Sequence, residues 1–157
     1  MTAADCVRNY KSLAEVERAF RSMKTIDLKI RPIHHHLADR VRSHIFLCML
    51  AYYVEWHMRE AWRPLLFADE DQLAKTTRDP VAAAKRSAAA EAKAASHLLD
   101  DGTSAHSFGT LQQELADIVR NTCRAPKAGN GAPTFEITTI PNPKQARAFE
   151  LLNTIRL

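Results

Sequence analysis

Glu17 is the residue of this chain whose neighbours in sequence could support chemistry. Arg21 follows it by four positions and Lys24 by seven, so on a helix the three side chains line one flank. A carboxylate with two cations one and two turns further on could serve a metal site or a phosphate site. The same pattern is typical of a solvated row of salt bridges, and spacing by itself leaves both interpretations open.

A short amphipathic helix over residues 12–24 is predicted to carry these side chains. Ser12 followed by Glu15 has the form of a capping box, in which each side chain satisfies a free backbone amide of the first turn. The apolar residues recur at helical spacing and form one stripe: Leu13, Val16, Phe20 and Met23. Glu17 lies at the edge of this stripe. Residues 1–9 are polar and are expected to be loose.

Three residues of this segment form a wider pattern, because Tyr10, Glu17 and Lys24 stand at the spacing Tyr-x6-Glu-x6-Lys. This resembles the C-terminal signature of insertion-sequence DDE transposases, Tyr-x2-Arg-x3-Glu-x6-Lys. The next stretch, LKIRPIHHHLADRVRSHIFLCMLAYYVEW, also resembles the segment that follows the signature in that family. The resemblance is strong over residues 1–63 and loose beyond them. The signature's Arg falls on Leu13 here, so no role of that Arg can be carried over.

The resemblance implies a ribonuclease-H-like core. In that core, two aspartates on strands and a glutamate on a later helix hold a pair of Mg²⁺ ions for phosphodiester cleavage and strand transfer. By similarity Glu17 would be that glutamate, both a catalytic residue and a metal ligand. Tyr10 and Lys24 would contact DNA near the cleaved phosphate. Carboxylates are ligands that Mg²⁺ favours.

The acids that would complete such a site are not found near Glu17 in the sequence. Sixteen residues precede Glu17, and Asp5 is the only acid before Glu15. The aspartate-bearing strands are therefore expected upstream, and the chain is expected to be a C-terminal fragment of a transposase that is catalytically silent alone and does not bind Mg²⁺ tightly. Whether it acts as an enzyme is left open.

Two alternatives remain beside the fragment. One is a non-enzymatic helical protein that binds DNA or binds a full-length transposase. The other is one half of a split transposase, whose missing N-terminal half supplies the aspartates.

The fold class that the sequence predicts is mostly α with a short β component. It is expected to be the C-terminal piece of a ribonuclease-H-like α/β catalytic core followed by a helical tail. Three segments are predicted: residues 1–63 as the C-terminal part of the catalytic domain, residues 64–106 as an Ala-rich linker, and residues 107–157 as a small helix-strand-helix module.

A long helix is predicted from Asp39 to Trp62, after a short extended piece over residues 25–31. Residues 45–54 within it carry no charge. Such a run is too short to cross a bilayer, which needs about 20 residues, so no membrane partner is expected. It is typical of a helix buried on most sides, and in a fragment its apolar face is expected to be under-covered.

The tail has weaker signals. Residues 81–96 include nine alanines in sixteen positions, which favours a helical linker. Thr110 is predicted to cap a helix, and the Gly and Pro residues of 125–133 predict a loop. Residues 135–139 alternate as a strand, and Pro143 can open a last helix.

Charge and cysteine content narrow the function classes. Residues 1–63 hold eleven basic against seven acidic residues, and the remainder holds eleven of each, a modest bias towards phosphate partners. The three cysteines lie far apart without a Cys-x2-Cys pair, which argues against a disulfide framework and a zinc site. Three consecutive histidines, 34–36, do not face one another on a helix and predict no metal site. No signal-peptide pattern is present, and a cytoplasmic location is expected.

Overall fold

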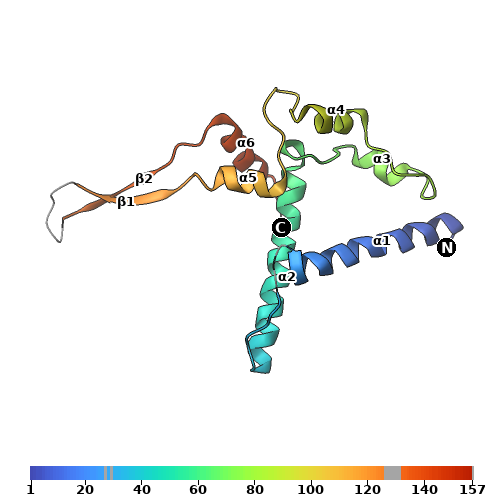
Figure 1. Cartoon of the computed structure of the whole chain (residues 1–157), viewed down its shortest axis with the longest axis horizontal. Helices are drawn as coiled ribbons and strands as arrows, with labels where there is room; N and C mark the ends of the chain where they lie inside the picture. Colours follow the sequence, from blue (N-terminus) through green and yellow to red (C-terminus); the bar gives the residue numbers. More distant parts are fainter. Residues whose placement is uncertain (27, 29, 126–131, 157) are drawn as a thin grey trace. The chain divides into compact units, whose positions relative to one another are not determined.

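The computed structural model describes residues 1–26, 28, 30–125 and 132–156. It is mostly helical with one small antiparallel sheet of two strands, which confirms the predicted class of mostly α with a short β component (Figure 1). Among the described residues, no helix combines the length and apolar character that crossing a membrane requires.

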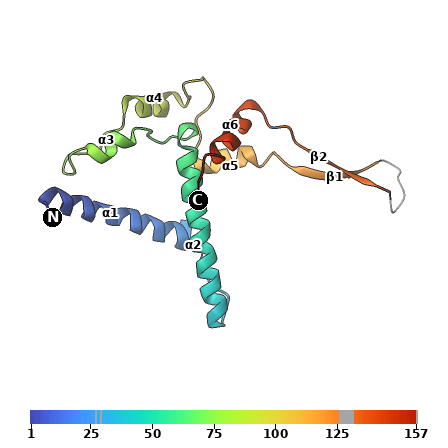
Figure 2. The ribbon, with the colours of Figure 1, turned by 180° about the vertical axis from the view of Figure 1, so that it is seen from behind.

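The chain forms two compact units rather than one. Unit 1 comprises Met1–Glu60 with Asp69–Ser87, and unit 2 comprises Ala61–Ala68 with Ala88–Leu157. The same elements can be followed from behind in Figure 2. These units do not follow the three segments expected from sequence, and that division stays a prediction.

The first helix, α1 (Ala3–Arg21), begins earlier than the sequence pattern suggested. Thr2 is its N-cap: the Thr2 hydroxyl accepts from the Asp5 amide at 3.1 Å, and the Asp5 carboxylate accepts from the Thr2 amide at 3.0 Å. The hydroxyl of Thr2 also lowers the pKa of Asp5, which strengthens the cap because a carboxylate accepts better than an acid.

The prediction of a capping box at Ser12 and Glu15 is therefore wrong. Ser12 lies in mid-helix, and its hydroxyl donates to the carbonyl of Asn9 at 2.7 Å. The expectation of a loose start is wrong as well, because residues 3–9 are helical. Thr-x-x-Asp offers the same cap chemistry as Ser-x-x-Glu, and the upstream box allows the longer helix.

A π-helical segment, Ser22–Ile26, continues directly from α1. It replaces the beginning of the extended piece predicted for residues 25–31. Asp27 and Lys29 of that prediction lie outside the described residues.

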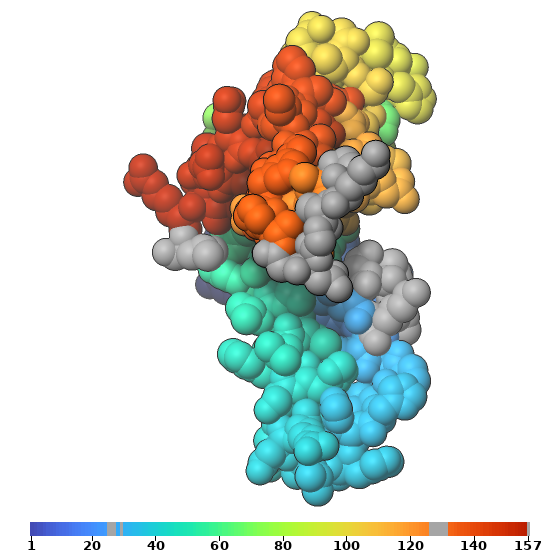
Figure 3. Space-filling model, turned by 90° about the vertical axis from the view of Figure 1, so that its left-hand side faces the viewer, coloured from blue at the N-terminus to red at the C-terminus, as the bar shows by residue number. Residues whose placement is uncertain are grey.

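The long helix α2 (Ala38–Ala61) confirms the prediction for residues 39–62. The segment before it runs along one side, with the carbonyl of Ile30 3.2 Å from Nε2 of His44; this segment is light blue and α2 turquoise in Figure 3. Neither α1 nor α2 buries a single residue. The apolar surface of both helices, including residues 45–54, is therefore largely uncovered, as the sequence predicted for α2.

The rest of unit 1 is a loop around α3 (Gln72–Thr77), whose N-cap is Asp71. Asp69 closes this loop by accepting from the amide and from the hydroxyl of Ser87, each at 2.8 Å. This helix was not predicted, because its six residues are too few to show a period.

Unit 2 holds most of the buried apolar side chains of the described chain. Trp62, Leu65 and Leu111 are the largest that are fully buried. The indole N–H of Trp62 donates to the carbonyl of Ala148 at 2.9 Å, and its ring lies 5.6 Å from that of Phe108. A single aromatic residue thus joins three parts of unit 2: η2 (Arg63–Leu65), α5 (Phe108–Leu115) and α6 (Pro143–Leu152).

The helix α4 (Ala88–Ser96) is shorter than the helix predicted over residues 81–96. It also packs: Ala90 is buried, and so is Lys93, whose ammonium group donates to the carbonyl of Leu66 at 3.3 Å. This part of the Ala-rich segment therefore belongs to a core, where small side chains allow close approach.

Each of the last two helices begins with a capping box. Ser107, not Thr110, is the N-cap of α5, and Thr110 is the third residue of the same capping box. The prediction for Thr110 was therefore wrong by three positions. Asn142 and Gln145 form the equivalent box of α6, with Pro143 at its start as predicted.

A two-stranded ribbon connects these helices. β1 (Arg120–Arg124) pairs antiparallel with β2 (Thr134–Thr138), in a register that places Thr122 opposite Glu136. The predicted strand over residues 135–139 is confirmed with a shift of one residue, whereas β1 was missed. Most of the loop predicted over residues 125–133 lies outside the described residues.

Replacing Leu111 by alanine should destabilise unit 2. Leu111 is 1% exposed, and removing a buried leucine leaves a cavity that costs about 2–5 kcal/mol. Leu73→Ala is the matched control, because Leu73 is 74% exposed and should change stability by no more than about 0.5 kcal/mol. Urea unfolding followed by circular dichroism measures both. Equal costs for the two variants would contradict this placement of the core.

Candidate functional site

The transposase-like residues lie along one flank of α1 and its π-helical extension. Residues seven apart on an α-helix drift by only about 20°, so Tyr10 and Glu17 lie almost in line. Lys24 falls in Ser22–Ile26, where the wider π turn moves it off that line. All three side chains are exposed, Tyr10 by 77%. Tyr10 and Glu17 therefore share one accessible side of α1, and Lys24 is exposed beyond its end.

Glu17 and Glu15 differ in what surrounds them. Among the described residues Glu17 has no hydrogen bond or ion pair, whereas Glu15 lies 4.0 Å from the ammonium group of Lys75. Lys11, on the same side of α1 as Glu15, donates to the carbonyl of Pro80 at 2.5 Å. The loop over residues 69–87 thus lies against the side of α1 that carries Lys11 and Glu15. The opposite side of α1, which carries Glu17, is left exposed.

Lys24 has a contact of its own. Its ammonium nitrogen lies 5.7 Å from the ring centroid of Phe20, within the range of a cation–π interaction. An exposed contact of this kind is weak and positions the cation without neutralising it. Lys24 therefore keeps its charge available at the surface.

The carboxylates around Glu17 do not by themselves fit a pair of Mg²⁺ ions. No three His, Cys, Asp or Glu side chains come close enough together to hold a metal within the part of the chain that the structure describes. His35, from the row of three histidines, packs edge-on against His44 at 5.7 Å. Among the described residues, Glu17 therefore has no neighbouring acids that would complete the predicted metal site.

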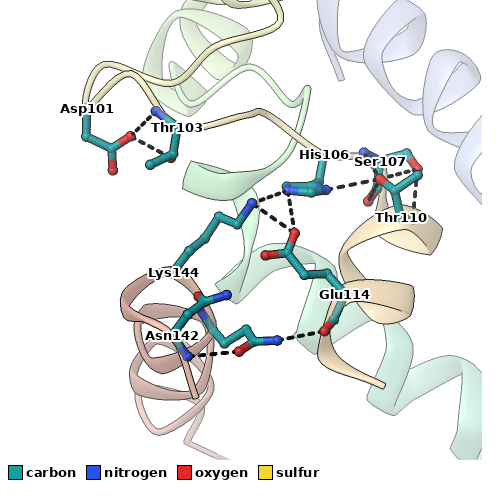
Figure 4. Close-up of polar contacts among 9 residues, drawn as sticks. Asp101, Thr103, His106, Ser107, Thr110, Glu114, Asn142 and Lys144 are labelled. Carbon is teal, nitrogen blue, oxygen red and sulfur yellow. Dashed lines mark hydrogen bonds and ion pairs between the residues drawn. The ribbon is translucent and has the colours of Figure 1, made fainter. Parts of the chain in front are cut away.

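A second polar group, in unit 2, was not predicted from the sequence. His106, Glu114 and Lys144 form what we call the His106 cluster (Figure 4). Lys144 Nζ lies 2.8 Å from Oε2 of Glu114 and 3.0 Å from Nε2 of His106. Nε2 of His106 is itself 3.1 Å from Oε2 of Glu114. The three side chains are only 12–23% exposed.

Burial lowers the pKa of His106, and the charge of Lys144 lowers it further, while Glu114 opposes both. The neutral imidazole fits the geometry. Its Nε2 can accept from Lys144 while Nδ1–H donates to the Thr110 hydroxyl at 3.3 Å.

The arrangement has a structural use. The Thr110 hydroxyl is held in the α5 cap, where it accepts from the amide of Ser107 at 2.9 Å, so it is not poised as a nucleophile. The His106 cluster instead joins α5 to α6. Gln145 repeats that link by donating to the Glu114 carbonyl at 2.8 Å.

The neighbouring turn is fixed in a similar manner. Asp101 accepts from the amide and the hydroxyl of Thr103 (Figure 4), and these two hydrogen bonds lower the pKa of Asp101. Arg147 of α6 lies 2.8 Å from its other oxygen. The local sequence does not predict the His106 cluster or the Asp101–Arg147 ion pair. Each includes a contact between residues nearly 40 or more positions apart.

Comparison of the chain with models of protein families, with curated proteins and with solved structures finds no match. The likeness to transposases therefore rests on the signature residues and the stretch that follows them.

Unit 2 should lose stability as the solution is acidified past the ordinary pKa of histidine. Because burial in the folded state lowers the pKa of His106, the unfolded chain binds more protons as the pH falls below about 6.5, and stability must fall with pH there. His106→Gln should remove this part of the pH dependence. Urea unfolding of both proteins between about pH 5 and 7.5 measures it. Identical pH profiles would contradict a lowered pKa of His106 in the folded state.

Proposed function

We propose that this chain supplies the glutamate-bearing helix of an insertion-sequence DDE transposase, whose catalytic core is ribonuclease-H-like. The observation that carries the proposal is the exposed flank of α1, where Glu17 stands unpaired among the described residues, in line with Tyr10 and followed by Lys24. The aspartates, and with them the Mg²⁺ site, would be completed by polypeptide other than these 157 residues.

The surroundings of Glu17 support this role. The apolar stripe of α1 lies beside the flank, and Leu13, Val16 and Phe20 are each more than half exposed. A polypeptide that packed on the stripe would bring its own side chains next to Glu17. The opposite side of α1 is already occupied by Lys75 and Pro80, so the open side is the one that carries the signature.

In this proposal the chain alone is catalytically silent, since one carboxylate cannot position two metal ions. Tyr10 and Lys24 would bind the DNA backbone beside Glu17, through a hydroxyl and a cation respectively. Such a protein would work in the cytoplasm.

A second candidate function is DNA binding without catalysis. It is favoured by the nine basic against four acidic residues between positions 8 and 42. It needs no partner polypeptide, and Glu17 would then be a solvated residue without a chemical role.

Catalysis should depend on Glu17 once the aspartates are supplied. The chain is co-expressed with the aspartate-bearing N-terminal part of a related insertion-sequence transposase, and strand cleavage of DNA is measured with Mg²⁺. Glu17→Gln should abolish cleavage, because it removes a ligand charge while preserving shape. Glu15→Gln is the matched control two positions away and should cleave like the parent.

Two results separate the candidates. Cleavage that survives Glu17→Gln but not Glu15→Gln would overturn the assignment. No cleavage by any combination, together with DNA binding by the chain alone, would favour the second candidate.

Lys24→Ala should weaken DNA binding and flatten its salt dependence. A phosphate contact releases about one counterion, so the slope of log K against log salt should fall by about 1. Fluorescence anisotropy with duplex DNA between about 50 and 200 mM salt measures it. Lys75 of α3 lies against the opposite side of α1, beside Glu15, and Lys75→Ala should leave the slope unchanged. The assignment fails if Lys24→Ala leaves it unchanged too.

A further inference from the structure

The open face of α2 has the spacing of a coiled-coil seam. Phe46, Met49, Tyr53 and Trp56 are separated by three, four and three residues, the alternation of a and d positions in a heptad. Between 49% and 64% of each residue is exposed. A second face, about a third of a turn round the helix, is half-buried instead, at Val41, His44, Cys48, Tyr52 and Glu55. The chain thus covers one side of α2 and leaves the seam free.

We propose that this seam binds a second copy of the chain, with the two α2 helices antiparallel. The seam is defined as Phe46, Met49, Tyr53 and Trp56. The inference concerns unit 1 alone, and it does not depend on whether Glu17 belongs to a catalytic site.

The order of residues favours the antiparallel direction. In an antiparallel pair centred level with Ala51, Phe46 meets Trp56 of the second copy, and Met49 meets its Tyr53. Each layer then combines residues of different shape, and a methionine beside an aromatic ring is a favourable contact.

The charges at the two ends of the seam agree with this direction. Arg42 stands seven residues before Met49, and Glu60 stands seven after Tyr53, so each is the next layer of the same seam. Antiparallel helices bring Arg42 of one copy to Glu60 of the other. Parallel helices would place Arg42 against Arg42 and would align the two helix dipoles unfavourably.

The available surface is sufficient for a weak dimer. The seam and the adjoining Leu50, which is 47% exposed, offer about 500 Å² in each copy, or about 1,000 Å² for the pair, at the lower end of specific interfaces. We therefore expect a dimer that dissociates in the micromolar range.

Sedimentation velocity of the full chain from about 1 to 100 µM tests the contact, a range that spans the affinity expected for an interface of this size. The parent should change from monomer to dimer. Met49→Glu puts a carboxylate into the seam and should raise the dissociation constant at least tenfold. Leu47→Glu is the matched control on the same helix: Leu47 is 61% exposed but faces away from the seam, and the variant should dimerise like the parent.

Cross-linking tests the direction. In a background where Cys6, Cys48 and Cys123 are serine, Phe46→Cys and Trp56→Cys proteins are mixed and treated with a short bismaleimide. The antiparallel pair gives mixed 46–56 products, whereas parallel helices give 46–46 and 56–56 products. Circular dichroism of each variant checks that α2 is retained.

Three results would overturn the proposal. These are a monomer at the highest concentration, equal loss of dimer in Met49→Glu and Leu47→Glu, or cross-links only between identical positions. If a variant loses its helix, the unmodified chain still decides the matter through its mass at high concentration.

Discussion

Apolar side chains gain stability by leaving water, at about 25 cal/mol per Å², and in this chain that gain is concentrated in one place. Trp62 is 1% exposed, and its indole N–H is satisfied by the carbonyl of Ala148. An unpaired indole N–H at that depth would cost about 1–3 kcal/mol. The hydrogen bond therefore lets one of the two tryptophans of the chain enter a core. Residues from η2, α5 and α6 pack around it.

Among the residues of unit 1 that the structure describes, no large side chain is fully buried in this way. Its two long helices bury no residue, although α2 carries ten consecutive uncharged positions. A contiguous apolar surface beyond a few hundred Å² is unusual for a soluble monomer and marks an interaction site. For this reason we propose that the stripe beside Glu17 and the seam of α2 bind other polypeptide. Polar contacts do join the loop of residues 69–87 to the side of α1 that carries Lys11 and Glu15.

Sequence patterns predicted the elements whose conformation depends on neighbouring residues. The helices α2 and α6 were predicted from period and from Pro143, and β2 from alternation, while Glu17 was correctly placed on an exposed helical flank. The start of α1 was misplaced because Thr2 and Ser12 both begin a valid capping box, and only continuity of the helix selects the first. β1 was missed because its residues, RNTCR, gain their strand conformation from pairing with β2. The His106 cluster was missed because it depends on the packing of α5 against α6.

Hydrogen exchange of the purified chain at low micromolar concentration measures directly whether the apolar core lies in unit 2 alone. Core amides open only with a whole unit, whereas weakly packed segments open locally. We expect strong protection in α5 and α6 around Leu111 and Ala148, and weak protection in α1 and α2. Protection of α2 should rise with protein concentration. Protection of α2 equal to that of α5 at every concentration would contradict this placement of the core, because it would show that unit 1 covers its own apolar surface.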